Sequence, residues 1–399
     1  MSINAYLRAD GRKGIRNTLV VAYLVECAHH VSREVYYPFR EQGVHLIGFP
    51  GCFPNVYSHK MMERLCTHPN VGAALLVSLG CEGFNKGKLQ ETIRKSGRPV
   101  KLIEIQGSGG TRKTIAEAKA WVEQTLKQLK DTPRAPMSID ELIVGTICGG
   151  SDATSGLTAN PAMGRAFDFL VEQNATCIFE ETGELIGMEH WMARRAENPA
   201  LGEEIVNTVA KAAKYYATYG HASIGPGNAD GGLTTIEEKS LGAYAKSGQS
   251  VISGIIKPGD VPIKGGLYLL DVVPDGEPRF GFPNISDNAE IAELMACGSH
   301  LSLFSTGRGS VVGSAISPVI KVCANPNTYK RMSDDMDVDA GRILEGRATL
   351  DEVGREIYDL ILRVCNGEQT KSEALGHQEF ILTYKSFEPI GPACFPSAA

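Results

Sequence analysis

The chain has 399 residues, of which 43% are hydrophobic and 22% charged, with a net charge of −6. This composition is typical of a globular protein large enough for two cores, and it excludes a disordered or fibrous chain. The charge is spread without a basic block, so neither nucleic acid nor an anionic membrane is expected as a partner, and small molecules are the better candidates.

The sequence shows no signs of a targeting signal or of a disulfide framework. The N-terminus has no apolar leader-like region, and no stretch approaches the roughly 20 apolar residues of a membrane span, so a cytoplasmic location is expected. The ten cysteines include no C-x-x-C pair, and in a reducing compartment they are not expected to form a disulfide framework. These thiols are therefore core residues, catalytic groups or metal ligands.

Four apolar runs, at residues 18–25, 44–49, 73–79 and 142–147, each stop just before a cysteine. The cysteines are Cys27, Cys52, Cys81 and Cys148. Short apolar runs separated by helical patterns are typical of buried parallel strands, whose carboxyl ends form the ligand-binding edge of an open α/β sheet. The pattern predicts that all four thiols lie at such an edge.

The remaining elements divide the chain into two α/β units. A run at 100–105 leads through a glycine-rich turn into an amphipathic helix, and two prolines within 131–136 mark a linker. We predict an α/β fold with a Rossmann-like N-terminal domain containing a parallel sheet (1–133), followed by a larger, glycine-rich catalytic α/β domain (134–399). In the second domain, helices are expected near 162–173, 201–215 and 350–364, and strands at 176–179, 250–256, 269–273 and 302–305.

The segment from Cys148 to Asp152 places a thiol, a hydroxyl and a carboxylate in one turn after a strand, followed by Asn160. Its glycines allow backbone N–H groups to approach a ligand, and a helix starting near Pro161 directs its positive end toward an anion. The alternative is a plain loop with a helix N-cap.

Two further glycine-rich segments carry polar side chains. Residues 225–233 contain four glycines around Asn228, and residues 306–310 place Arg308 between two glycines, where a guanidinium can hold a carboxylate by two bonds. A tight turn and a solvated charge are the respective alternatives.

Acidic residues follow the run at 176–179. Glu180, Glu181 and Glu184 come directly after it, with His190 further along a predicted helix. Such carboxylates act as bases or metal ligands, or simply complement a helix dipole. Soft thiolates at three strand ends similarly indicate iron, an iron–sulfur cluster or zinc, although a buried free cysteine is also common in cores.

Taken together, these segments resemble the altronate and galactarate dehydratase family. The resemblance rests on co-linear motifs that cover nearly the whole chain: the opening segment at 6–17, Gly51-Cys52, Gly80-Cys81-Glu82, Cys148-Gly149-Gly150-Ser151-Asp152, Pro226-Gly227-Asn228, Gly231-Gly232-Leu233, Glu238-Lys239-Ser240, Thr306-Gly307-Arg308-Gly309 and Met336-Asp337.

The resemblance implies an iron-dependent hydro-lyase that converts a small hydroxylated carboxylate into a 2-keto-3-deoxy acid. It leaves Fe²⁺ and an iron–sulfur cluster as alternatives. We expect metal ligands at Cys52, Cys81 and Cys148, catalytic roles for Glu181, His190 and Lys239, and substrate contacts from Ser151, Asp152, Asn160, Asn228 and Arg308.

Departures from the family pattern leave the substrate open. Asp230 stands where a lysine is common, and the opening motif begins almost at the N-terminus, where the family has a small extra domain. We therefore expect a separate small subunit as a partner, together with a homo-oligomer. A sulfolactate sulfo-lyase large subunit, which expels sulfite, is the near alternative, and a non-catalytic ligand-binding protein is the distant one.

Overall fold

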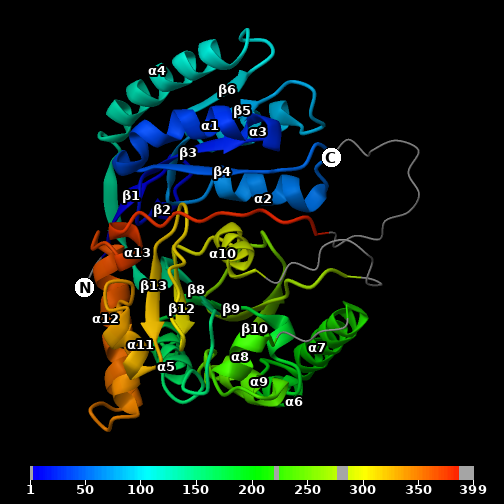
Figure 1. The fold of residues 1–399 in the computed structure, drawn as a ribbon, viewed down its shortest axis with the longest axis vertical. Coiled ribbons are helices and arrows are strands. Elements are labelled where there is room, and N and C mark those ends of the chain that lie inside the picture. Colours follow the sequence, from blue (N-terminus) through cyan, green and yellow to red (C-terminus); the bar gives the residue numbers. More distant parts are fainter. Residues whose placement is uncertain (1–2, 220–223, 276–285, 386–399) are drawn as a thin grey trace.

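The computed structural model describes residues 3–219, 224–275 and 286–385. Figure 1 shows two parallel sheets, one in each half of the molecule, joined by a small antiparallel sheet. The predicted α/β class is confirmed. No helix in the described ranges is long and apolar enough to cross a membrane.

The N-terminal sheet has the strand order β4-β3-β5-β6. Its strands are β3 (Thr18–Tyr23), β4 (Val44–Gly48), β5 (Val71–Ser78) and β6 (Val100–Glu104). Helices α1 (His29–Tyr36) and α4 (Thr111–Leu129) cover one face through a core of aliphatic side chains. The other face packs on α2 (Val56–Cys66) and α3 (Lys86–Lys95).

The C-terminal sheet has seven parallel strands in the order β10-β11-β9-β8-β12-β13-β14. Their bounds are β8 (Ile143–Cys148), β9 (Thr176–Phe179), β10 (Ile252–Ile256), β11 (Gly266–Leu270), β12 (Leu301–Thr306), β13 (Val319–Cys323) and β14 (Val338–Asp339). β8 and β9 lie side by side, whereas β12 adds to the opposite side of β8. The strand order therefore reverses between β8 and β12, and ligands bind at such a switch point in open α/β sheets.

Helices cover both faces of the larger sheet. α5 (Ala159–Val171), α7 (Pro199–Tyr219) and α12 (Leu350–Cys365) contribute to the core on one side. On the other side, α10 (Asp287–Ala296) lies between the two sheets and shares a core with α2. The shorter helices are α6 (Glu189–Ala193), α8 (Pro226–Asp230), α9 (Ile236–Ala245), α11 (Pro326–Arg331) and α13 (Lys371–Ala374).

A small antiparallel sheet connects the two halves of the chain. β1 (Ile3–Leu7) pairs antiparallel with β2 (Lys13–Gly14) and with β7 (Arg134–Met137), so the start of the chain is hydrogen-bonded to the segment that enters the second half. Most predicted strands agree with the structure to within two or three residues. β11 begins at Gly266, three residues before the predicted run, and that run continues past the end of the strand.

Candidate functional site

The candidate site lies at the carboxyl ends of β8 and β9. Cys148 is the last residue of β8, and Glu180 and Glu181 come directly after β9. Glu184 ends the short 3-10 helix Thr182–Glu184 that follows. Parallel pairing brings these two strand ends to one edge, so the fold itself places the thiol beside the carboxylates.

Cys148, Glu181 and Glu184 form a buried group whose potential ligand atoms lie within 4.8 Å of one another. The Cys148 Sγ atom is 3.1 Å from Glu181 Oε1 and 3.4 Å from Glu184 Oε2. Burial, and then the negative charge of Glu184, raises the pKa of the Cys148 thiol above its ordinary value. Without a further cation the thiol is therefore neutral and donates to a carboxylate.

Two buried lysines neutralise these carboxylates. Lys239 on α9 forms an ion pair with Glu184, and Lys246, just after α9, forms one with Glu181. Burial alone would lower the pKa of Lys239, but the charge and hydrogen bond of Glu184, together with the nearby Cys148 and Asp287, outweigh it and hold the pKa above its ordinary value. Lys239 is therefore a fixed positive charge and not a base at neutral pH.

The backbone at Glu181 is strained. Its φ is +82°, in the left-handed region that a residue with a side chain rarely adopts. Such conformations cost free energy and persist where the surroundings enforce them, often at functional sites. Here the turn directs Glu181 back toward Cys148.

The predicted substrate-binding residues of the Cys148 loop line a small cavity beside this group. Its lining includes Ser151, Asp152, Asn160, Glu184 and Lys239. The cavity volume is about 10 Å³, room for about one water molecule. A sugar acid therefore requires one of the walls to move.

Two of these side chains are held firmly. Asp152 accepts hydrogen bonds from the Thr154 backbone N–H (2.9 Å) and from Asn325 Nδ2 (2.9 Å). The Asn160 side chain donates to Gly242 O (2.9 Å) and accepts from Ser305 Oγ (2.6 Å). Ser151, in contrast, donates through Oγ to Cys148 Sγ at 3.2 Å, so it touches the buried thiol directly.

The two glycine-rich segments meet each other above the Cys148 loop. The Arg308 guanidinium donates to the carbonyl oxygen of Gly227, and Asn228 Nδ2 donates to Ser151 O at 3.0 Å. Arg308 is exposed, and its contact is with a backbone carbonyl. Its predicted role as a carboxylate clamp stays a prediction.

Asp287, the first residue of α10, is a site residue that the sequence reasoning missed. A Cβ atom on Gly149, the residue after Cys148, would overlap the Asp287 carboxylate. Burial, followed by the negative charge of Glu184, raises the pKa of Asp287 to about 6. An acidic residue in the first turn of a helix is so common that its position alone carries no functional signal.

Three predicted residues lie elsewhere. Cys52 and Cys81 are exposed and follow β4 and β5 of the N-terminal sheet, where the backbone N–H of Gly83 joins their two loops by donating to Cys52 O at 2.8 Å. The structure does not bring Cys52, Cys81 and Cys148 into a ligand group among the described residues, because the first two belong to a different sheet. His190 is exposed on α6 and lines a shallow hollow against α7.

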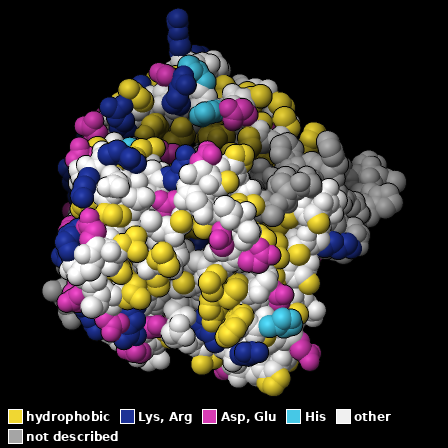
Figure 2. Space-filling model, turned by 60° about the horizontal axis from the view of Figure 1, so that its bottom comes forward, with side chains coloured by type: hydrophobic (Ala, Val, Ile, Leu, Met, Phe, Trp, Pro, Cys, Tyr) yellow, Lys and Arg dark blue, Asp and Glu magenta, His cyan; other side chains and the backbone are white. Residues whose placement is uncertain are grey.

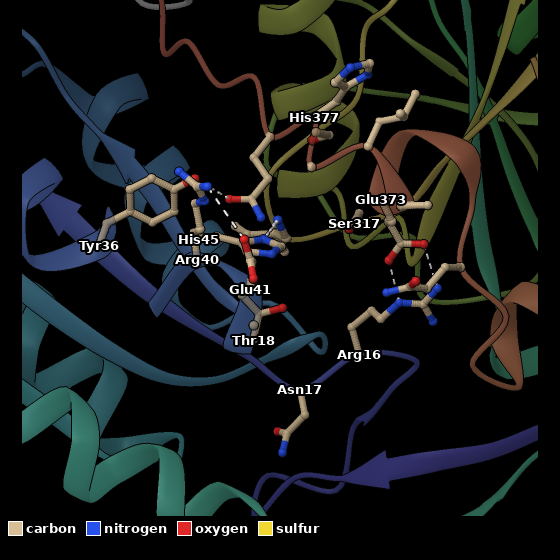
Figure 3. A pocket seen from close by; sticks show the side chains of 18 of the residues that line it. Arg16, Asn17, Thr18, Tyr36, Arg40, Glu41, His45, Ser317, Glu373 and His377 are labelled. Atoms are coloured by element: carbon tan, nitrogen blue, oxygen red, sulfur yellow. Dashed lines mark hydrogen bonds and ion pairs between the residues drawn. The ribbon is translucent and has the colours of Figure 1, made fainter. Parts of the chain in front are cut away.

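A deeper polar cavity, of about 620 Å³, lies at the amino ends of β3 and β4 (Figure 3). Arg16 and Glu373 form an ion pair on one wall, and Tyr36 donates to Gln378 on another. Ligand crevices of open parallel sheets lie at the opposite, carboxyl edge. Figure 2 shows basic and acidic side chains interspersed over the visible face, with no extended basic surface.

Comparisons with known proteins agree with this architecture. The family model described as D-galactarate/altronate dehydratase, C-terminal, matches residues 139–387. A second, described as D-galactarate dehydratase/altronate hydrolase, second domain, matches residues 5–130. The chain belongs to the galactarate/altronate dehydratase family.

Individual relatives differ in what their names say they act on. The chain is 34% identical to the (2R)-sulfolactate sulfo-lyase subunit beta of Chromohalobacter salexigens, across 95% of this chain and 96% of that protein. It is 28% identical to the altronate dehydratase of Escherichia coli, across 95% and 77% of the two chains. The galactarate dehydratase (L-threo-forming) of the same organism is 32% identical, across 78% and 59%. All three are lyases, so lyase chemistry is supported and the substrate is not resolved.

Proposed function

We propose that this protein is a hydro-lyase that removes water from a small hydroxylated carboxylate, such as a sugar acid, to give a 2-keto-3-deoxy acid. The observation that carries the proposal is the buried group of Cys148, Glu181 and Glu184, with two lysines, at the carboxyl edge of the sheet in a family of lyases. β-Elimination needs a base for the proton next to the carboxylate, positive charge for the anion that develops, and help for the departing hydroxide.

The chain's own residues suit these tasks. Asp287, whose pKa is about 6, is largely ionised at neutral pH and is the proposed base that takes the proton. Lys239 and Lys246 are buried cations that stabilise negative charge as the substrate carboxylate becomes enolate-like. Ser151 and Asn160 supply polar groups beside the cavity for the substrate hydroxyls.

Iron is the proposed cofactor, with Cys148, Glu181 and Glu184 as its ligands. One sulfur and two carboxylates within ligating distance suit a single ferrous ion better than a cluster held by three thiolates. Bound there, iron would supply a Lewis acid for the departing hydroxide. Cysteine binds as the thiolate, so loading the site releases the proton that the thiol now donates to a carboxylate.

Expulsion of sulfite from a sulfonated hydroxy acid is the second candidate. The observation in its favour is the end-to-end match to a sulfo-lyase subunit, whereas the altronate dehydratase has sequence outside the match. The word "subunit" in that relative's name also supports the proposal that a separate small subunit acts as a partner.

A paired assay tests the function. Anaerobically purified protein, alone and with a candidate small subunit, is incubated with altronate, galactarate and sulfolactate. 2-Keto acid and sulfite are measured in each reaction, with Cys148→Ser as the inactive control. A 2-keto acid without sulfite supports the hydro-lyase, and sulfite from sulfolactate supports the alternative. If neither product forms with any substrate, the lyase proposal fails and a ligand-binding role takes its place.

A further inference from the structure

A second buried carboxylate group lies directly behind the first. Glu180, Glu181 and Glu290 offer oxygen atoms within 4.8 Å of one another, and all three side chains are buried. Glu180 and Glu181 come from the end of β9, and Glu290 comes from the first turn of α10. Glu181 belongs to both groups, so the second group is adjacent to Cys148 without including its sulfur.

The Glu180 side chain is the observation that sets this group apart from an ordinary acidic cluster. It is 1% exposed, and neither of its carboxylate oxygens has a hydrogen-bond partner in the described parts of the chain. A buried polar group without a partner costs roughly 1–3 kcal/mol, and more when it is charged. Its oxygens are nevertheless held among other carboxylate oxygens, where only a cation or a proton can satisfy them.

The local charge count points in the same direction. Glu180, Glu181, Glu290 and Glu293 bring four carboxylates together, whereas Lys246 pairs with Glu181 and Lys385 pairs with Glu293. Both lysines are buried and committed to these pairs. Glu180 and Glu290 are thus left without a paired cation among the described residues, a deficit that one divalent cation would cancel.

We propose that Glu180, Glu181 and Glu290 bind a hard divalent cation, of the class of Mg²⁺, Mn²⁺ or Ca²⁺, next to the Cys148 group. All three donors are carboxylate oxygens, the ligand type that these ions prefer over the sulfur-containing set next door. The shared carboxylate of Glu181 would link the two positions. The proposal does not depend on the reaction assigned above, because it concerns binding alone.

The test is a Mn²⁺ titration of chelator-treated protein, with free Mn²⁺ measured by electron paramagnetic resonance. Wild type is expected to bind one Mn²⁺ per chain, with Mg²⁺ competing. Cys148→Ser is expected to retain this site, whereas Glu180→Gln and Glu290→Gln weaken it at least about tenfold. Glu204→Gln, on the exposed side of α7, is the matched control and is expected to bind like wild type.

Thermal unfolding provides a readout that does not depend on the variants. A cation that binds only the folded state raises the melting temperature of the protein, and above Kd the rise grows with the logarithm of the cation concentration. Millimolar Mg²⁺ or Mn²⁺ is therefore expected to raise the melting temperature of the wild type. No rise with either ion overturns the proposal, as does Mn²⁺ binding that survives in both glutamine variants. Mn²⁺ binding that is lost only in Cys148→Ser also overturns the proposal, since the ion would then be bound by the group of Cys148, Glu181 and Glu184. Wild-type protein that binds Mn²⁺ as expected but shows no lyase activity would instead count against the proposed reaction and leave the cation site standing.

Discussion

Cys148 differs from the other predicted ligands because of what surrounds it. It is buried against two carboxylates, whereas Cys52 and Cys81 are exposed at the edge of another sheet. The two ligand hypotheses, three cysteines from the sequence pattern and one cysteine with two glutamates from the structure, make different predictions for the same set of variants.

We expect Cys148→Ser to lose most of the iron of anaerobically purified protein, while Cys52→Ser and Cys81→Ser retain it. Serine keeps the shape but is a poor ligand for a soft metal. Iron is measured by a colorimetric chelator assay, and circular dichroism checks the fold. Equal losses in all three variants would restore the three-cysteine hypothesis, and iron retained in Cys148→Ser would remove Cys148 from the site.

Asp287 carries the second prediction at the level of single residues. Asp287→Asn is expected to lower kcat by roughly 10²–10⁴-fold, the usual contribution of a positioned base. A base works in its ionised form, so kcat/KM of the wild type should fall as the pH drops through about 6. The pH profile of the active wild-type enzyme is the measurement.

A control on the same helix shows whether the effect is specific. Asn288→Ala changes the residue next to Asp287 and is expected to leave kcat within about threefold, a difference of under roughly 0.7 kcal/mol. A kcat of Asp287→Asn close to that of the wild type would mean that another residue is the base. The same conclusion would follow if the residual activity of Asp287→Asn still fell as the pH dropped through about 6.

At the scale of elements, the two glycine-rich segments contact each other and the backbone of the Cys148 loop. Arg308, from the loop after β12, reaches the backbone of Gly227 in α8. A Cβ atom on Gly227 would meet the Arg308 guanidinium, whereas a Cβ atom on Gly225 would find only an ordinary contact with Asn228. The two glycines are therefore a matched pair.

We expect Gly227→Ala to raise KM several-fold with a smaller change in kcat, because the guanidinium must leave its present position. Gly225→Ala, whose φ of −103° any residue can adopt, is expected to stay close to wild type. Steady-state kinetics of both variants, with melting temperatures to check stability, decide between them. Equal kinetic effects would mean that the Arg308 contact does not shape the site.

The elements were largely predictable because buried parallel strands leave a local signature. The run at 176–179 coincides with β9, and the predicted helix at 350–364 is α12, which the Thr349–Glu352 capping box starts. Which strands share a sheet, in contrast, depends on contacts between distant parts of the chain and was not predictable from local sequence. The sequence pattern treated four cysteine-terminated strands alike, yet three belong to the four-stranded sheet and β8 to the seven-stranded one.

The candidate site was also predictable only in part. Cys148, Glu181 and Lys239 were chosen from the sequence, and the structure places them in one buried group. Asp287 and Lys246 come from helix positions where charged residues are ordinary, so only the fold shows that they point inward. Whether such side chains face inward depends on packing between elements far apart in the chain, which the periodicity of the sequence does not record.

At the scale of the whole molecule, a buried polar network holds the two halves together. Glu293 on α10 is fully buried and accepts a hydrogen bond from the Tyr57 hydroxyl of α2 at 2.6 Å. Its carboxylate also pairs with Lys385, 2.8 Å away, in the C-terminal segment. In Figure 1 that segment runs between the two halves, alongside α2. Three segments that are distant in sequence thus depend on one carboxylate.

We expect Glu293→Gln to destabilise the protein by about 3–5 kcal/mol, because it removes the carboxylate that pairs directly with the buried Lys385 ammonium. Tyr57→Phe removes one hydrogen bond to a charged group and is expected to cost about 1.5–3 kcal/mol. The exposed pair of Glu123 and Lys127 on α4 provides the control, since Glu123→Gln should cost less than about 1 kcal/mol. Urea denaturation, followed by circular dichroism, measures the free energy of unfolding of all three variants.

The expected loss of stability decreases in the order Glu293→Gln, Tyr57→Phe, Glu123→Gln, which follows from burial and charge. A Glu293→Gln variant as stable as Glu123→Gln would mean that Lys385 reaches solvent and that the apolar contacts of α10 and α2 alone join the two halves.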